Sequence, residues 1–135
     1  WSVKHVRGGL VDVEFIAQFL QLRWAATHPD CLAVSAIDAL GRLIEAELIA
    51  PEEGEALIAA ARLWRRLQTV LRLCLAEGSA ALEDRKLADA PEGLRRLLAD
   101  AAGARDFDAA LAMAEAAGRA VEAIFDRIIG PPPNA

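Results

Sequence analysis

The chain has 135 residues, of which 55% are hydrophobic, and a formal net charge of −5 at pH 7. This length suits a single domain, and the acidic balance argues against nucleic acid as a partner of the chain as a whole. The apolar runs are too short to span a membrane. Ala and Leu are abundant, whereas Phe is scarce and Tyr is absent, a mixture that favours helices over strands.

The ends and the cysteines indicate a cytoplasmic piece of a longer protein. The chain begins at Trp1, without Met and without a signal-peptide pattern. Residues 131–135 form a proline-rich tail that cannot continue a helix, which leaves residues 1–130 as one helical domain. Cys31 and Cys74 form no CxxC motif or Cys/His cluster, so we expect free thiols in a reducing compartment and no metal site.

The first expected helix covers residues 10–26 and follows the pair Gly8-Gly9. Apolar residues surround most of its circumference, which predicts that this helix is the packing centre of the domain. Its polar residues Glu14, Gln18 and Gln21 recur at helical spacing and form one stripe.

Four more helices are expected, at residues 36–47, 51–76, 91–102 and 106–129. Ser35 and Asp106 are suited to cap the second and fifth helices, and Pro51 and Pro91 suit the first turns of the third and fourth. Residues 79–90 lack a clear period and are interpreted as a connector. Short loops between helices favour antiparallel neighbours, so the fold class is an all-α bundle of about five helices.

The glycine pair before the first helix is the most distinctive local feature. Gly8 and Gly9 allow positive φ or a close backbone approach, and Lys4 and Arg7 add positive charge beside a helix N-terminus. These four residues predict a contact with an anion or with a neighbouring domain. The alternative is a simple glycine turn, with Asp12 compensating the helix dipole.

The chain lacks the common catalytic motifs, such as a phosphate-binding loop or a zinc-protease helix. Asp12 and Glu14 are two residues apart, so on one helix their side chains diverge and cannot share a metal ion. The expected site therefore contains no catalytic and no metal-binding residue.

Four arginines, Arg62, Arg65, Arg66 and Arg72, lie along the third helix. Arg65 and Arg72 share one face, and Arg62 and Arg66 share another. A solvated face is one interpretation, and a surface for an acidic partner or a nucleotide-binding neighbour is the other.

Two segments resemble the helical domain of glutamine synthetase adenylyltransferases and, more loosely, that of PII uridylyltransferases. The resemblance is strong over residues 4–26 and 51–75 and weaker to about residue 129. Asp12, Glu14, Phe15 and Gln18 keep the spacing of the family motif. The two segments are Arg7-Gly8-Gly9-Leu10-Val11-Asp12-Val13-Glu14-Phe15 and Arg62-Leu63-Trp64-Arg65-Arg66-Leu67.

The resemblance implies a parent enzyme with two similar halves, each a nucleotidyltransferase domain followed by a helical bundle. One half transfers AMP from ATP to a tyrosine of glutamine synthetase, and the other removes it by phosphorolysis, which regulates nitrogen assimilation. The metal-binding carboxylates lie in the nucleotidyltransferase domain, so Mg²⁺ and ATP belong to the parent enzyme and not to this chain. The implied partners are that upstream domain, glutamine synthetase and the PII signal protein.

Alternatives remain for two questions: which half of the parent enzyme the chain resembles, and what its exact function is. Asp89-Ala90-Pro91-Glu92 and Asp106-Phe107 resemble the carboxy-terminal, AMP-attaching half, whereas residues 73–78 depart from the AMP-removing half. The other functional interpretations are a helical domain of a PII uridylyltransferase-like protein and a free-standing interaction module without an enzymatic role.

Overall fold

The computed structural model describes residues 8–75 and 91–130 of the chain. Within these ranges the regular structure is helical, without a strand, so the expected all-α bundle is confirmed. The expected connector at residues 79–90 and the proline-rich tail at 131–135 lie outside the described residues. The elements are α1 (Leu10–Trp24), the short 3₁₀ helix η1 (Pro29–Cys31), α2 (Ala36–Glu45), α3 (Pro51–Leu75), α4 (Glu92–Ala102) and α5 (Phe107–Ile128).

Most helix ends follow local chemistry that the sequence displays. The side chain of Ser35 accepts a hydrogen bond from the Asp38 N–H, and that of Asp106 accepts one from the Ala109 N–H, so both expected N-caps are present. Gly103 ends α4 in the left-handed conformation, with φ at 71°. Glu47 takes the same conformation after α2, with φ at 59°, although it is not a glycine.

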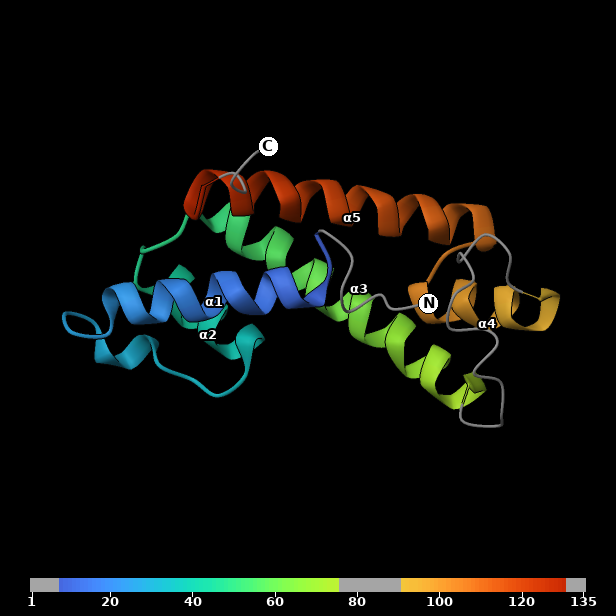
Figure 1. Ribbon diagram of the computed structural model, residues 1–135, viewed down its shortest axis with the longest axis horizontal. Helices are drawn as coiled ribbons and strands as arrows, with labels where there is room; N and C mark the ends of the chain where they lie inside the picture. The colour runs from blue at the N-terminus through green and yellow to red at the C-terminus, as the bar shows by residue number, and fades with distance from the viewer. Residues whose placement is uncertain (1–7, 76–90, 131–135) are drawn as a thin grey trace.

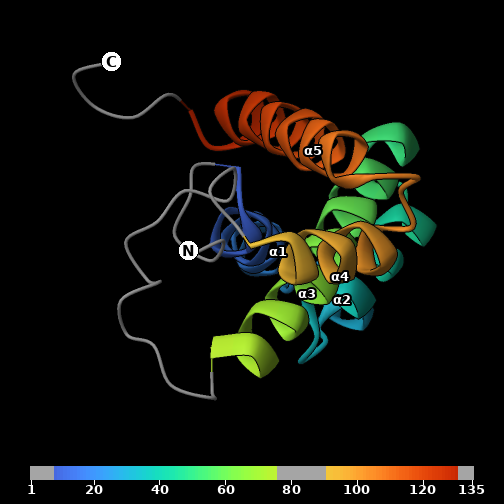
Figure 2. The same ribbon diagram turned by 90° about the vertical axis from the view of Figure 1, so that its right-hand side faces the viewer.

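The long helix α3 is the centre of the bundle. It packs against α1, α2, α4 and α5, whereas α1 packs against α2, α3 and α5 but makes no substantial contact with α4. In Figure 1, α5 lies along the top of the bundle, with α1 below its C-terminal half and α4 below its N-terminal end, and both of these helices extend beyond it. Figure 2 shows α1 almost end-on at one side of the bundle. The expectation that the first helix is the packing centre is therefore wrong.

The core of α3 recurs at helical spacing on the side that faces its neighbours. Its buried residues are Leu57, Ala60, Ala61, Leu63, Trp64, Leu67 and Leu71. The Trp64 indole N–H is buried without an acceptor in the part of the chain that the structure describes.

Helices α3 and α5 run antiparallel. The guanidinium of Arg127, near the end of α5, forms a two-pronged ion pair with the carboxylate of Glu53, in the first turn of α3. At the start of α3, a Cβ on Gly54 would lie 2.5 Å from Cγ1 of Ile44 in α2. The absence of a side chain at this position therefore lets α2 and α3 approach closely.

Candidate functional site

The glycine turn before α1 is held inside the domain. The Gly8 N–H donates to Oδ2 of Asp12 at 2.7 Å, so Asp12 closes the turn from within the helix. Gly8 has φ at +75°, and a Cβ built on it would lie 2.1 Å from the carbonyl oxygen of Gly118 in α5. This geometry gives Gly8 a packing role between α1 and α5, which the anion hypothesis did not include.

The other residues of the expected anion contact are placed only in part. Gly9 is the N-cap of α1, with extended φ and ψ and no side-chain cap. The N–H groups of the first turn are therefore not satisfied by a capping side chain. Lys4 and Arg7 lie outside the described residues, so their contribution stays a prediction.

The outward face of α1 carries the family motif. Glu14 is half-buried, and Phe15 and Gln18 are exposed, so these three residues lie away from the core. The buried side of the helix consists instead of Leu10, Val13, Ile16, Ala17, Leu20 and Gln21. The side chains of Glu14, Phe15 and Gln18 are therefore at least partly open to solvent in this bundle.

Three apolar residues and Gln18 follow one line along this outward face. We call Val11, Phe15, Gln18 and Leu22 the outer stripe; their spacing of four, three and four residues places them in one line along a helix. Phe15 is 50% exposed and Leu22 is 82% exposed. The exposure of Leu22 was not expected, because the apolar residues around most of the helix predicted burial on most of its sides.

A polar groove runs along one flank of the outer stripe. It has a volume of about 300 Å³ and brings together Glu14 and Gln18 of α1 with Arg65 of α3. Its far wall is the segment that leads into α2, residues 33–36. Glu14 and Arg65 have no ion-pair partner among the residues that the structure describes. The groove thus joins one acidic and one basic group from the two segments that carry the family resemblance.

Gln21 forms the floor of this groove and was expected only as part of a polar stripe. Its side-chain Nε2 donates to the Ala17 carbonyl at 3.2 Å, and its Oε1 accepts from the Ala33 N–H at 2.8 Å. Arg42 donates to the carbonyls of Asp30 and Leu32, which directly precede this segment. Two side chains therefore hold the groove wall and the residues that precede it.

Replacing Gln21 by Ala is expected to destabilise the domain by about 1–2 kcal/mol, because the partly buried Ala33 N–H loses its acceptor. The matched control is Gln18→Ala on the exposed side of the groove, for which a change within about 0.5 kcal/mol is expected. Urea unfolding followed by circular dichroism measures both values. Equal effects of the two substitutions would contradict the structural role of Gln21.

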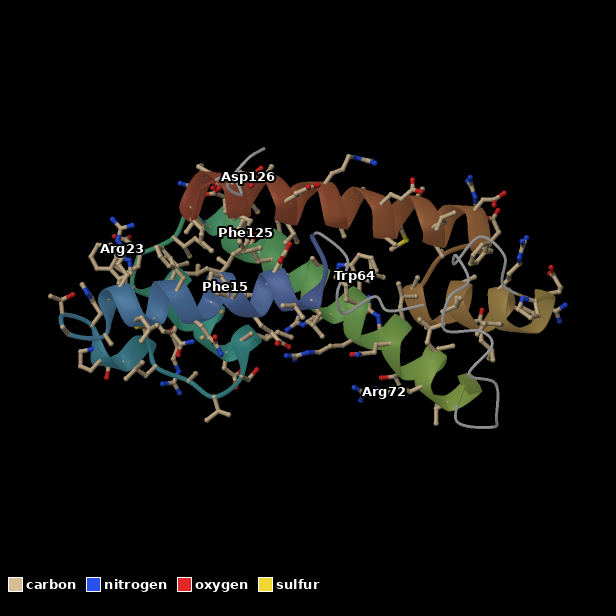
Figure 3. All side chains as sticks on the ribbon, in the orientation of Figure 1. Phe15, Arg23, Trp64, Arg72, Phe125 and Asp126 are labelled. Carbon is tan, nitrogen blue, oxygen red and sulfur yellow. The ribbon has the colours of Figure 1, made fainter. Side chains whose placement is uncertain are left out.

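The four arginines of α3 do not form one surface. Arg65 is half-buried and lines the groove, whereas Arg62, Arg66 and Arg72 are exposed. Arg72 follows Arg65 by seven residues, about 10 Å along a helix axis, and Figure 3 shows it near the distal end of α3, away from α1. Only Arg65 joins the motif residues of α1.

The other flank of the outer stripe is aromatic. The rings of Phe15 and Phe125 lie 5.9 Å apart between centroids, at an interplanar angle of 35°. Figure 3 shows the two labelled side chains between α1 and α5. Phe15 thus contacts α5 with one side of its ring while half of its surface stays open.

Two further properties concern only the residues that the structure describes. They contain no group of three or more His, Cys, Asp or Glu side chains that could hold a metal ion. No helix among them is long and apolar enough to cross a membrane.

Comparison with known proteins identifies relatives over almost the whole chain. Curated proteins named bifunctional glutamine synthetase adenylyltransferase/adenylyl-removing enzyme are similar to it. The protein from Rhodopseudomonas palustris (strain HaA2) is 38% identical over 130 residues, which cover 96% of this chain and 13% of that protein. The protein from Xanthobacter autotrophicus is 39% identical over 132 residues, which cover 96% of this chain and 12% of that protein.

This chain therefore spans only 12–13% of the length of these relatives. No solved structure matches the chain. A family model described as GlnD PII-uridylyltransferase matches residues 1–128, and the adenylyltransferase relatives confirm the resemblance carried by the motif that begins at Arg7. The chain belongs to the GlnD PII-uridylyltransferase family, and it is also similar to bifunctional glutamine synthetase adenylyltransferases.

Proposed function

We propose that this chain is the helical domain of a glutamine synthetase adenylyltransferase, which transfers AMP from ATP to a tyrosine of glutamine synthetase and removes it again in its other half. The observation that carries the proposal is the 38% identity over 96% of the chain to a protein of that name. The Mg²⁺ and ATP sites then belong to a nucleotidyltransferase domain elsewhere in a cytoplasmic polypeptide.

The geometry supports an accessory role for the bundle. Transfer of a nucleotidyl group requires carboxylates that hold Mg²⁺ against the phosphates. Asp12 accepts the Gly8 N–H, and Glu14 lines the groove together with Arg65; among the described residues, neither belongs to a group of three or more side chains that could hold a metal ion. Such a domain supports the catalytic domain and helps position glutamine synthetase or the PII signal protein.

Two groups of residues are proposed to contact partners. The first group contacts a nucleotide phosphate or the neighbouring domain and consists of Lys4, Arg7 and Gly9. The absence of a side-chain cap at the start of α1 supports this proposal. The second group consists of the exposed arginines of α3, which include Arg62 and Arg66, and it contacts an acidic surface of a partner protein.

The name of the family model favours a second candidate, transfer of UMP to the PII protein by a uridylyltransferase. Full-length protein that contains this chain, incubated with labelled nucleotide and Mg²⁺, distinguishes the two. We expect label from ATP on a tyrosine of glutamine synthetase. Label from UTP on PII without label on glutamine synthetase would contradict the proposal.

The 135-residue chain alone is expected to transfer no label above background in the same assay, because the metal-binding carboxylates lie outside it. Its far-ultraviolet circular dichroism spectrum, measured in parallel, shows whether the sample is folded. Label on glutamine synthetase from folded, isolated chain would overturn the assignment of this bundle as an accessory domain.

A further inference from the structure

We propose that the outer stripe of α1 (Val11, Phe15, Gln18 and Leu22) is the docking face for an amphipathic helix from the part of the polypeptide outside this chain. The inference rests on the proposed function, because that function supplies an adjoining domain. The inference identifies the surface of this bundle that the adjoining domain covers, and the kind of secondary structure that covers it.

The first argument is the conflict between the sequence of α1 and its exposure. A helix with apolar residues around most of its circumference is normally buried on most sides, yet Leu22 is 82% exposed and Phe15 is 50% exposed. The buried side already contacts α2, α3 and α5, so the bundle itself has no further use for these two side chains. In Figure 1, α1 lies on the near side of the bundle with no other described helix in front of it.

The second argument is the spacing within the outer stripe. Residues that recur at intervals of four, three and four form a ridge along a helix, and such ridges pack into the grooves of another helix. Helix-in-groove recognition uses the same positions as anchors. The spacing therefore fits an amphipathic helix better than an irregular loop.

The third argument concerns the two flanks of the stripe, which differ in chemistry. Phe125 extends the apolar surface towards α5 by its contact with Phe15. On the opposite flank, Arg65 and Glu14 line the groove without an ion pair among the described residues. An incoming helix that places an acidic side chain beside Arg65 and a basic one beside Glu14 satisfies both groups.

The occupant follows from length and charge. The match covers 13% of the Rhodopseudomonas palustris relative, so similar proteins contain ample chain outside this domain. A second copy is disfavoured, because each copy carries a net charge of −5 and the copies repel each other. The rest of the same polypeptide is therefore the occupant that we assign.

Footprinting of the full-length protein with a carbene reagent tests the inference, with labelling read by mass spectrometry at Leu22 and Leu73. Leu73 is the matched control, because it is a 70% exposed leucine near the end of α3. We expect Leu22 to be labelled several-fold less than Leu73. The Leu22→Gln variant should raise labelling at Phe15, and Leu73→Gln should not.

Each other outcome overturns part of the inference. Equal labelling of Leu22 and Leu73 in the full-length protein shows an open stripe and overturns it entirely. If Leu22 is already protected from labelling in the isolated 135-residue chain, the outer stripe is covered by this chain itself. If the protection disappears on dilution and size-exclusion chromatography shows a dimer, the outer stripe is covered by a second copy of the chain.

The AMP-transfer assay on the same sample keeps the two proposals apart. Protection of Leu22 without AMP transfer to glutamine synthetase leaves the docking face standing and removes the proposed activity. AMP transfer together with equal labelling of Leu22 and Leu73 overturns the docking face and leaves the proposed activity standing.

Discussion

Replacement of Gly8 by Ala is expected to destabilise the domain by about 2–4 kcal/mol, one of the two largest effects that the structure predicts. Two physical costs act together at this position. A left-handed conformation with φ at +75° is unfavourable for any residue with a Cβ. The Cβ would also lie 2.1 Å from the Gly118 carbonyl oxygen and 2.8 Å from its Cα. Because these are backbone atoms, no side-chain rotation relieves the clash.

Urea unfolding of the chain measures this cost, and Gly41→Ala in α2 is the matched control. A Cβ on Gly41 meets nothing within 4 Å, so Ala there is expected to stabilise the helix by up to about 1 kcal/mol. Equal stability of the Gly8→Ala variant and the wild-type chain would show that α1 and α5 do not approach each other at this point. It would also return Gly8 to the hypothesis of an anion contact.

The helices and their caps could be predicted because the signals are local. Ser35, Asp106 and Gly103 act within one turn of the helix ends that they define. The end of α1 was predicted less accurately: the sequence favoured a helix to residue 26, whereas α1 ends at Trp24. There the Thr27 and His28 N–H groups turn back to the Trp24 carbonyl, and neither residue is a common helix terminator.

The arrangement of the helices depends on pairs that are distant in sequence. Gly8 meets Gly118, and Glu53 pairs with Arg127, and no periodic pattern within one helix reveals such partners. The groove is a similar case, because Arg65 joins the motif of α1 only after α1 and α3 have packed.

The error about the packing centre has a specific physical origin. Apolar periodicity shows which residues avoid water, but it does not show whether the covering surface belongs to the same chain. In α1 the pattern includes Leu22, which this bundle leaves 82% exposed. Residues for a core and residues for a docking face are therefore indistinguishable in the sequence of this helix.

Truncation of Leu67 to Ala in α3 is expected to cost about 2–5 kcal/mol, because it opens a cavity in the central helix. Leu67 is 2% exposed, and α3 contacts each of the other four long helices. A cavity on this helix is difficult for the neighbours to fill, since each is held by several contacts in the bundle. The loss should therefore be close to that of the largest core truncations.

The matched control for this prediction is Leu73→Ala, six residues along the same helix, where the side chain is 70% exposed. Both substitutions remove the same atoms from the same helix, so differences in helix propensity cancel and the burial term remains. A change within about 0.5 kcal/mol is expected for Leu73→Ala. Similar losses for both variants in chemical unfolding would contradict the burial of Leu67 in the core. A large loss for Leu67→Ala alone is the result expected of a side chain buried where α3 packs against its neighbours.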